Sequence, residues 1–143
     1  MKIKKTVEAI ETETIAPCGM NCSLCIAFLR EKNCCPGCNG RDAGKAKTRV
    51  ICRIKNCEEL QTGSQKFCFA CGRYPCRRLK DLDKRYRTRY GMSMIENLGY
   101  IRDNGLIAFV GNERKRWSCP ACGGIVSVHR KSCIYCNRAR GTL

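Results

Sequence analysis

Cysteine pairs constrain this chain more than any other feature of its sequence. Fifteen of the 143 residues are cysteine, and most of them stand in close pairs of the C-x-x-C type. Thiols spaced this closely chelate a metal ion well, whereas a disulfide between them closes only a short loop and stabilises little. The odd number of cysteines also disfavours a closed set of disulfides. The spacing therefore predicts a small protein stabilised by bound metal ions.

The C-terminal cysteines have the spacing of a zinc ribbon, with two C-x-x-C pairs separated by ten residues: Cys119, Cys122, Cys133 and Cys136. Four thiolates leave no open coordination position, which indicates a structural zinc site. The apolar run 125–128 and a turn near Lys131 predict a β-hairpin between the pairs. A redox-active pair would need a helix after its first cysteine, and Gly123-Gly124 favours a strand instead. We expect His129, the only histidine, not to be a ligand.

The N-terminal half holds eleven cysteines between residues 18 and 76, enough for two more four-thiolate sites. The most economical first site joins two close pairs, Cys22 with Cys25 and Cys35 with Cys38. The second site then takes Cys52, Cys57 and Cys68 with Cys71 or Cys76. Ligands that cross between these segments, such as Cys18 with Cys76, remain open. We therefore expect about three Zn²⁺ ions per chain.

An iron–sulfur cluster is the alternative cofactor for the N-terminal half. The spacing Cys18-x3-Cys22-x2-Cys25 is also used by radical enzymes that hold a [4Fe–4S] cluster and S-adenosylmethionine. Those enzymes resemble α/β barrels, which need far more than 143 residues, so that activity is disfavoured. Zinc is preferred in the cysteine-rich half because C-P-G-C and C-P-A-C segments are typical zinc binders.

The residues between the two cysteine-rich regions have helical periodicity. An apolar stripe with steps of three and four residues predicts a helix from residue 77: Leu79, Leu82, Tyr86 and Tyr90. Gly91 is a natural terminator, and the capping box Ser93–Glu96 opens a second helix that ends at Asn104-Gly105. The apolar run 106–110 fits either a helix or a strand.

These elements predict a small metal-stabilised α+β fold in three segments. We expect a cysteine-rich zinc domain with short helices at 17–76, a basic helical segment at 77–114 and the zinc-ribbon β-hairpin at 115–138. No signal peptide is visible, and no run of 18 apolar residues is present to span a membrane. Reduced thiols and metal ligands favour the cytoplasm. The sequence does not predict the oligomeric state.

The charge of the chain suggests a polyanionic partner. The formal net charge is +16, and residues 119–143 contain no acid. Three zinc ions with four thiolates each would lower the net charge to about +10. Basic residues gather on the predicted helix and near the second cysteine pair: Arg77, Arg78, Lys84, Arg85, Arg87, Arg89, Arg130 and Lys131. Arginines bind phosphates, and Trp117 could stack on a base, so RNA or DNA binding is the leading interpretation.

Two other functions fit the same residues. The basic helix could meet an acidic protein partner, which would make the chain an adaptor. Alternatively, the surplus cysteines Cys18, Cys34 and Cys76 could serve redox chemistry or metal transfer. No phosphate-binding loop or Ser/His/Asp arrangement is present, so a non-catalytic role is favoured. The acids of the helical segment are spaced as surface partners of Lys and Arg: Asp81, Asp83, Glu96 and Asp103.

The order of the cysteine motifs resembles a known family. The resemblance rests on Cys18-Gly-Met-Asn-Cys22-Ser-Leu-Cys25, Cys35-Pro-Gly-Cys38, Cys52-Arg-Ile-Lys-Asn-Cys57 and Cys68-Phe-Ala-Cys71-Gly-Arg-Tyr-Pro-Cys76. It is to small cysteine-rich prokaryotic proteins known mainly as a domain of unknown function, with metal binding predicted. The resemblance covers about residues 18–80, and the rest looks like a zinc-ribbon-like extension. It implies a metal and a cytoplasmic location, without a reaction.

Overall fold

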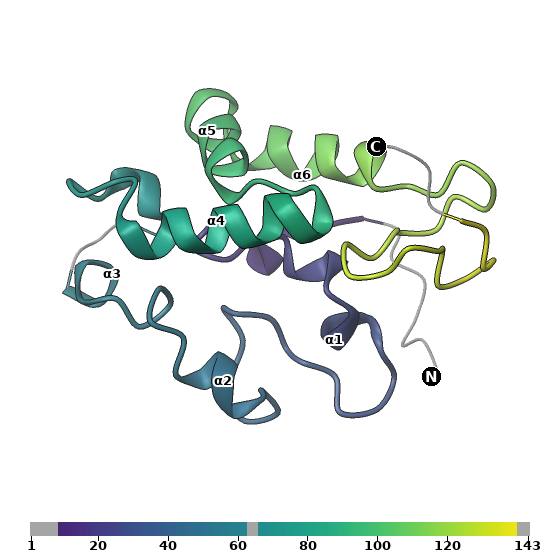
Figure 1. Cartoon of the computed structure of the whole chain (residues 1–143), viewed down its shortest axis with the longest axis horizontal. Helices are drawn as coiled ribbons and strands as arrows, with labels where there is room; N and C mark the ends of the chain where they lie inside the picture. The colour runs from purple at the N-terminus through teal and green to yellow at the C-terminus, as the bar shows by residue number, and fades with distance from the viewer. Residues whose placement is uncertain (1–8, 63–65, 140–143) are drawn as a thin grey trace.

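The fold is built from three longer helices, with the shorter helices and their loops below them in Figure 1 and the C-terminal loops at their right-hand end. The computed structural model describes residues 9–62 and 66–139. The longer helices are α4 (Arg77–Tyr90), α5 (Met94–Asn104) and α6 (Leu106–Arg116). The shorter helices are α1 (Ile26–Leu29), α2 (Lys47–Val50) and α3 (Glu58–Thr62). Single 3₁₀ turns are η1 (Thr12–Thr14), η2 (Cys22–Leu24) and η3 (Cys68–Ala70).

The corner between α4 and α5 forms as the sequence predicts. Helix α4 ends at Gly91, whose φ of +69° lies in the left-handed region that glycine adopts without strain. Ser93 then caps α5, because its hydroxyl accepts the backbone N–H of Glu96 at 3.1 Å. Helix α5 packs against both α4 and α6. The ambiguous run 106–110 is helical and opens α6.

The Asp83 side chain stabilises the corner between α4 and α5 from its buried side. The expectation that Asp83 lies on the surface is therefore wrong. Its carboxylate is buried and accepts the Ser93 hydroxyl at 2.6 Å and the Ile95 N–H at 3.0 Å. Arg87 adds an ion pair at 2.7 Å. Burial opposes ionisation, yet these three donors hold the pKa of Asp83 below its ordinary value.

Buried side chains from residues 10–29 and 79–133 meet in one core, and residues 30–78 pack only partly buried side chains against it. Its largest fully buried members come from the N-terminal segment, the helices and the C-terminal loops: Ile15, Leu24, Leu29, Leu79, Met92, Met94, Leu98, Phe109, Trp117, Ile125 and Val128. Two hydrogen bonds to the same oxygen help to tie the C-terminal loops to the N-terminal half. Val128 donates its N–H to Leu24 O at 3.0 Å, and the Ser127 hydroxyl donates to the same oxygen at 2.9 Å.

Gly19 lets the N-terminal cysteine segment approach α5 closely. Its φ is +91°, and a Cβ built there would lie 2.7 Å from the backbone oxygen of Met94. Asn97 of α5 donates its side-chain amide to Gly19 O at 2.9 Å. Glycine is thus required twice over, for the backbone conformation and for the contact. The contact fixes Cys18 and Cys22 against the helices.

The prediction of an α+β fold with a zinc-ribbon β-hairpin is wrong, since residues 9–62 and 66–139 contain no β-strand. Only isolated bridges join Ser118 with Ile125 and Ser132 with Ala139 near the cysteine pairs. Residues 125–128 are all buried. Their backbone hydrogen bonds go to two different segments, since Val126 donates its N–H to Trp117 O at 2.7 Å and Val128 donates to Leu24 O at 3.0 Å, so no continuous ladder forms with either segment.

None of the described helices combines the length and the apolar character that crossing a membrane requires.

Candidate metal centre

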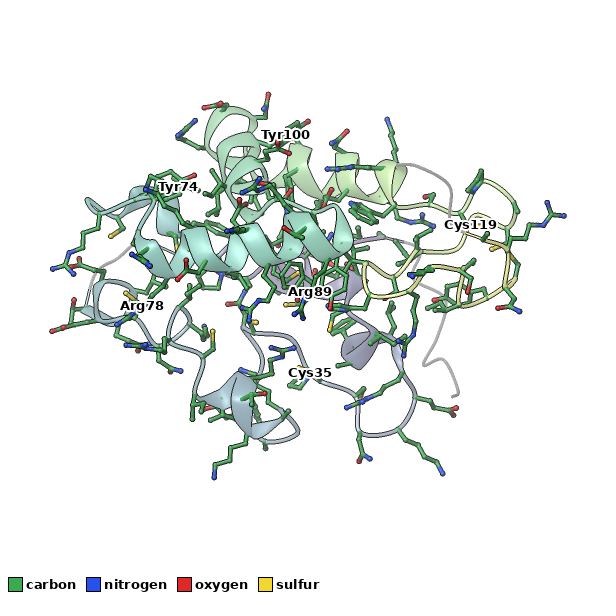
Figure 2. The ribbon with its side chains drawn as sticks, in the orientation of Figure 1. Cys35, Tyr74, Arg78, Arg89, Tyr100 and Cys119 are labelled. Atoms are coloured by element: carbon green, nitrogen blue, oxygen red, sulfur yellow. The ribbon has the colours of Figure 1, made fainter. Side chains whose placement is uncertain are left out.

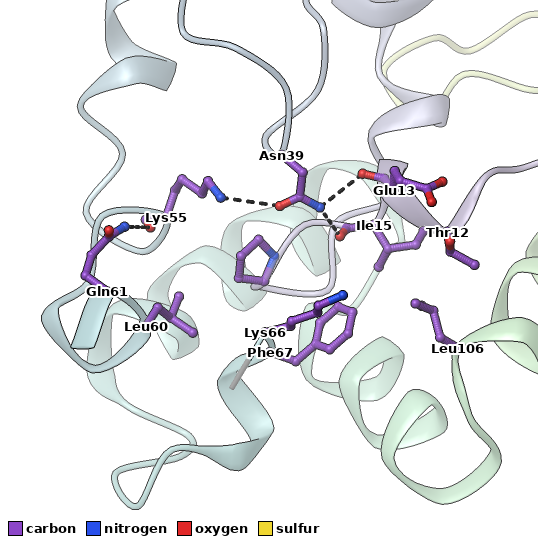
Figure 3. A pocket seen from close by; sticks show the side chains of 11 residues that line it. Thr12, Glu13, Ile15, Asn39, Lys55, Leu60, Gln61, Lys66, Phe67 and Leu106 are labelled. Carbon is purple, nitrogen blue, oxygen red and sulfur yellow. Dashed lines mark hydrogen bonds between the residues drawn. The ribbon is translucent and has the colours of Figure 1, made fainter. Parts of the chain in front are cut away.

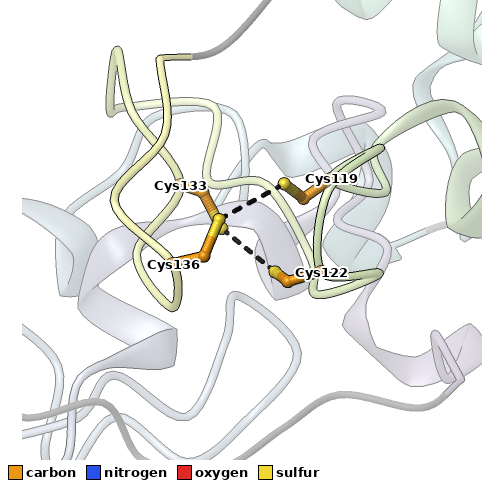
Figure 4. A group of neighbouring side chains, drawn as sticks. All are labelled: Cys119, Cys122, Cys133 and Cys136. Carbon is orange, nitrogen blue, oxygen red and sulfur yellow. Dashed lines mark hydrogen bonds between the residues drawn. The ribbon is translucent and has the colours of Figure 1, made fainter.

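The four C-terminal cysteines meet with their sulfur atoms in one small group (Figure 4). Cys119 Sγ lies 3.7 Å from Cys136 Sγ, and Cys122 Sγ lies 3.6 Å from Cys133 Sγ. All four sulfurs lie within 4.8 Å of one another. A tetrahedral zinc site with Zn–S bonds of about 2.3 Å has S–S edges of about 3.8 Å. The group therefore has the dimensions needed to hold one tetrahedral metal ion.

Local backbone hydrogen bonds build each half of this centre. Gly123 donates its N–H to Cys119 O at 2.8 Å, and Asn137 donates to Cys133 O at 3.0 Å. Both donors have positive φ, +76° for Gly123 and +64° for Asn137, so each cysteine pair ends in the same left-handed turn. Tyr135 N–H points at Cys133 Sγ at 3.5 Å. The sequence indicates this turn through glycine and asparagine, the residues that tolerate it best.

Two further backbone amides of the first turn favour a thiolate at Cys119. Hydrogen bonds from the N–H groups of Cys122 and Ala121 lower the pKa of Cys119 to about 7. At Cys122 a backbone hydrogen bond from Gly124 acts in the same direction, but burial and the neighbouring thiols raise its pKa to about 11. One thiol thus ionises readily, and a cation would ionise the rest, because metal-bound cysteines are thiolates.

The segment around the centre is anchored on the helical core. Trp117 is 1% exposed and donates its indole N–H to the buried carboxylate of Glu113 at 3.1 Å. Arg114 donates to Gly123 O at 3.0 Å and also to the Ser118 hydroxyl. These contacts hold the first cysteine pair at the end of α6. The burial of Trp117 also corrects the expectation that its ring could stack on a base.

His129 has hydrogen-bond partners on both ring nitrogens and stands outside the four-cysteine group. Nδ1 accepts the Ile26 N–H at 3.4 Å, and Nε2 lies 3.1 Å from the Tyr86 hydroxyl. Burial, with Arg49 and Arg130 nearby, lowers the pKa of His129, which favours the neutral ring. With Nδ1 accepting, the neutral ring carries its proton on Nε2. His129 therefore serves to dock the C-terminal loops on α4 and α1.

The N-terminal cysteines divide between two cavities. One cavity is lined by six of them: Cys18, Cys22, Cys25, Cys35, Cys38 and Cys52. The remaining four predicted ligands line a smaller pocket beside α3 and the start of α4: Cys57, Cys68, Cys71 and Cys76. Within the described ranges, only the C-terminal group has three or more sulfurs all within 4.8 Å. Cys34 lines neither cavity.

Two features of these cavities bear on their chemistry. Cys38 donates its backbone N–H to Cys22 Sγ at 3.5 Å. The adjacent Cys22 side chain, followed by the cations Lys45 and Arg49, lowers the pKa of Cys38 to about 6. In the smaller pocket, Arg73 N–H points at Cys71 Sγ at 3.4 Å, the same contact that Tyr135 makes with Cys133. Cys52 lies on the six-cysteine cavity, apart from Cys57.

The predicted basic residues are all exposed, and α4 carries most of them: Arg77, Arg78, Lys84, Arg85, Arg87 and Arg89. Figure 2 shows Arg78 and Arg89 on the ribbon of this helix. Arg130 and Lys131 follow His129, whose ring packs on Tyr90 with centroids 4.8 Å apart. This contact places the loop 130–131 beside the C-terminal end of α4. Tyr86 and Tyr90 are half-buried in the packing, as their place on the apolar stripe predicts.

A larger surface pocket, of about 400 Å³, lies between the N-terminal segment and Phe67 (Figure 3). Asn39 bridges it, since its amide donates to Ile15 O at 2.8 Å while its oxygen accepts Lys55 Nζ at 3.3 Å. No cysteine is among the described residues that line it. Its polar groups hold the loops together, and it contributes nothing to the metal centre.

Glu113 is the residue of this region that sequence reasoning missed. It is 1% exposed, and Asn21 donates to it at 3.4 Å from beside Cys22. Burial raises its pKa above the ordinary value, against the hydrogen bonds from Asn21 and Trp117. Nothing in the sequence distinguishes it from the surface acids of other helices.

Comparison with known proteins finds a similarity to one family over part of the chain and gives no activity. Residues 14–81 match the family described as a protein of unknown function (DUF3795). No curated protein and no solved structure matches the chain. The matched residues hold all eleven N-terminal cysteines, and they end before the C-terminal four-cysteine group. Over residues 14–81 the chain is therefore similar to a cysteine-rich family of unknown function.

Proposed function

We propose that the chain is a nucleic-acid-binding protein in which structural zinc holds a basic surface in place. The observation that carries this proposal is the outer side of α4, where seven basic side chains are exposed and Asp81 is the one exposed acid of that helix: Arg77, Arg78, Lys80, Lys84, Arg85, Arg87 and Arg89. Arginine and lysine contacts to phosphates supply most of the sequence-independent affinity for nucleic acids.

Zinc fits the C-terminal centre better than oxygen-preferring ions do on chemical grounds. Four thiolates at tetrahedral spacing suit Zn²⁺, while the oxygen-preferring ions Mg²⁺ and Ca²⁺ would find no oxygen ligand among the four side chains. A closed set of four protein ligands makes the ion structural. We assign a second Zn²⁺ to the pocket of Cys57, Cys68, Cys71 and Cys76, because four of the predicted zinc ligands line it together.

The zinc centre and the basic surface are linked through the loop 129–132. Buried Val128 and the ligand Cys133 fix the two ends of this loop, and His129 packs on α4 between them. Arg130 and Lys131 lie in the middle of the loop. Metal binding at Cys133 would therefore keep these two cations beside those of α4.

The test is to measure affinity for a single-stranded RNA and a duplex DNA as a function of salt. Each lost phosphate contact lowers the log–log slope by about 0.7–0.9. The triple variant Lys84→Gln, Arg85→Gln, Arg89→Gln should lose affinity and flatten the slope. A matched control, Lys32→Gln, Arg41→Gln, Lys47→Gln, changes the same charge on exposed residues away from α4 and should change little.

Equal losses of affinity in the two triple variants would show that the net charge acts without a defined site. That result would rule out α4 as the binding surface. Undetectable binding to either nucleic acid, with retained binding to an acidic polypeptide, would replace the proposal with the adaptor function.

A further inference from the structure

The six-cysteine cavity differs from the four-cysteine pocket in size. Its volume is about 90 Å³, against about 30 Å³ for the pocket of Cys57, Cys68, Cys71 and Cys76. The share of liquid volume of one water molecule is about 30 Å³. The smaller pocket therefore suits one ion, whereas the larger cavity has room for a group of several atoms.

The walls of the cavity suit an anionic cluster. Apolar side chains of several elements line it: Met20, Phe28, Leu82, Tyr86 and Met94. The charged residues of its lining are Lys45 and Arg49, and no carboxylate is among them. The side chain of Lys45 is 2% exposed and donates to Cys38 O at 2.9 Å, with Asp42 as a partner on its solvent side at 3.2 Å. A cluster with four thiolate ligands is anionic, and these two cations would balance it.

We propose that this cavity binds a [4Fe–4S] cluster through Cys18, Cys22, Cys25 and Cys38. The first three have the C-x3-C-x2-C spacing and lie on the short segment that Gly19 holds against α5. We choose Cys38 as the fourth ligand because it lies directly beside Cys22, whose Sγ accepts its backbone N–H at 3.5 Å. Such N–H···S contacts to ligand sulfurs are one means by which proteins tune iron–sulfur clusters. Cys35 and Cys52 line the same cavity without binding the cluster.

The experiment is anaerobic purification of the full chain, reconstitution with ferrous iron and sulfide, and assay of iron, acid-labile sulfide and zinc. The proposal predicts brown protein with about four iron and four sulfide per chain. Cys22→Ser and Cys38→Ser should lose the iron and the visible absorption. Cys34→Ser, whose thiol lines neither cavity, should keep both, and Cys122→Ser should lose one zinc ion while keeping the iron. Cys38 is half-buried on a loop, so its variant is informative even where Cys22→Ser fails to fold.

Colourless protein that takes up zinc alone in this cavity, with zinc lost from the Cys38→Ser variant, would overturn the cluster. Iron that remains equally in Cys22→Ser, Cys38→Ser and wild type would also overturn it, as adventitious iron. Neither result touches the C-terminal zinc centre or the basic surface, because Cys122→Ser and the binding assay report on those separately.

Discussion

The cysteines of the two regions differ in how closely their sulfurs are grouped. Four lie in the C-terminal region and eleven in the N-terminal region. The C-terminal sulfurs lie at 3.6–3.7 Å in pairs and need no rearrangement to hold an ion. The N-terminal cysteines are spread over residues 18–76 and line two cavities without forming a tight group among the described residues. The length of the connecting chain does not explain the difference, since nine residues separate Cys25 from Cys35 and ten separate Cys122 from Cys133. Each C-terminal pair is instead shaped by its own turn, which Gly123 or Asn137 closes by donating its N–H to the first cysteine of the pair.

The comparison implies that metal removal should act unequally on the two regions, and this is the largest effect we expect. Structural zinc contributes about 10–16 kcal/mol to the folding of isolated zinc peptides. Here the core anchors Trp117 and Val128 retain part of the fold, so Cys133→Ser should cost several kcal/mol. Denaturant unfolding of the variant, with and without chelator, measures this.

Cys34→Ser is the control for this measurement and should change the free energy of unfolding by about 0.5 kcal/mol or less. Equal stability of the Cys133→Ser variant and wild type would mean that the C-terminal group holds no structural ion.

The second effect concerns the anchor of the C-terminal region. Trp117→Ala removes a buried ring and leaves the Glu113 carboxylate without its indole donor, so we expect a loss of about 3–5 kcal/mol. Ile107→Ala, at a side chain that is 81% exposed, should stay within about 0.5 kcal/mol. Thermal unfolding of the two variants side by side measures the difference. A small effect at Trp117 would show that the C-terminal loops fold independently of α6.

The corresponding anchor of the N-terminal region is Gly19. Gly19→Ala places a Cβ 2.7 Å from Met94 O at a φ of +91°, so we expect a loss of about 1–3 kcal/mol. Gly111→Ala is the matched control, because nothing lies within 4 Å of its Cβ inside α6, and it should stabilise by up to about 1 kcal/mol. Urea unfolding of both variants tests this. Stabilisation by both substitutions would contradict the close approach of the Cys18 segment to α5.

The smallest effect tests Glu113, which contacts both regions through Asn21 and Trp117. Its pKa in the folded chain is raised by burial, so the folded state binds a proton more tightly than the unfolded state. Stability should therefore fall as pH rises through the ordinary value of 4.5 to the raised value. Glu113→Gln should remove this slope, by about 1 kcal/mol or less. The test is to measure the free energy of unfolding of wild type and Glu113→Gln as a function of pH. The same slope in both proteins would show that other groups cause the pH dependence.

Local signals in the sequence predicted much of the helical part and the grouping of the four C-terminal cysteines. Gly91 and the pair Ser93–Glu96 mark helix ends because each acts within one turn of chain. The spacing of Cys119, Cys122, Cys133 and Cys136 likewise brings sulfurs together over a short segment.

Features that depend on distant parts of the chain were not predictable. The run 125–128 has strand-like residues, but the core formed by Leu24 and the helices buries it without a strand partner. In the sequence, Asp83 and Glu113 resemble surface acids. Their burial depends on partners elsewhere in the chain, which are the Ser93 hydroxyl and Ile95 N–H for Asp83 and the indole of Trp117 for Glu113. The division of the N-terminal cysteines depends on loops with little regular structure, so spacing alone put Cys52 with Cys57.

The central claim is that the C-terminal four-cysteine group is a closed structural zinc centre. Native mass spectrometry of wild type and Cys136→Ser, with Cys34→Ser as control, tests it most directly. We expect Cys136→Ser to carry one zinc ion fewer per chain than wild type, and Cys34→Ser to carry the same number as wild type. The same zinc content in Cys136→Ser as in wild type would contradict the claim.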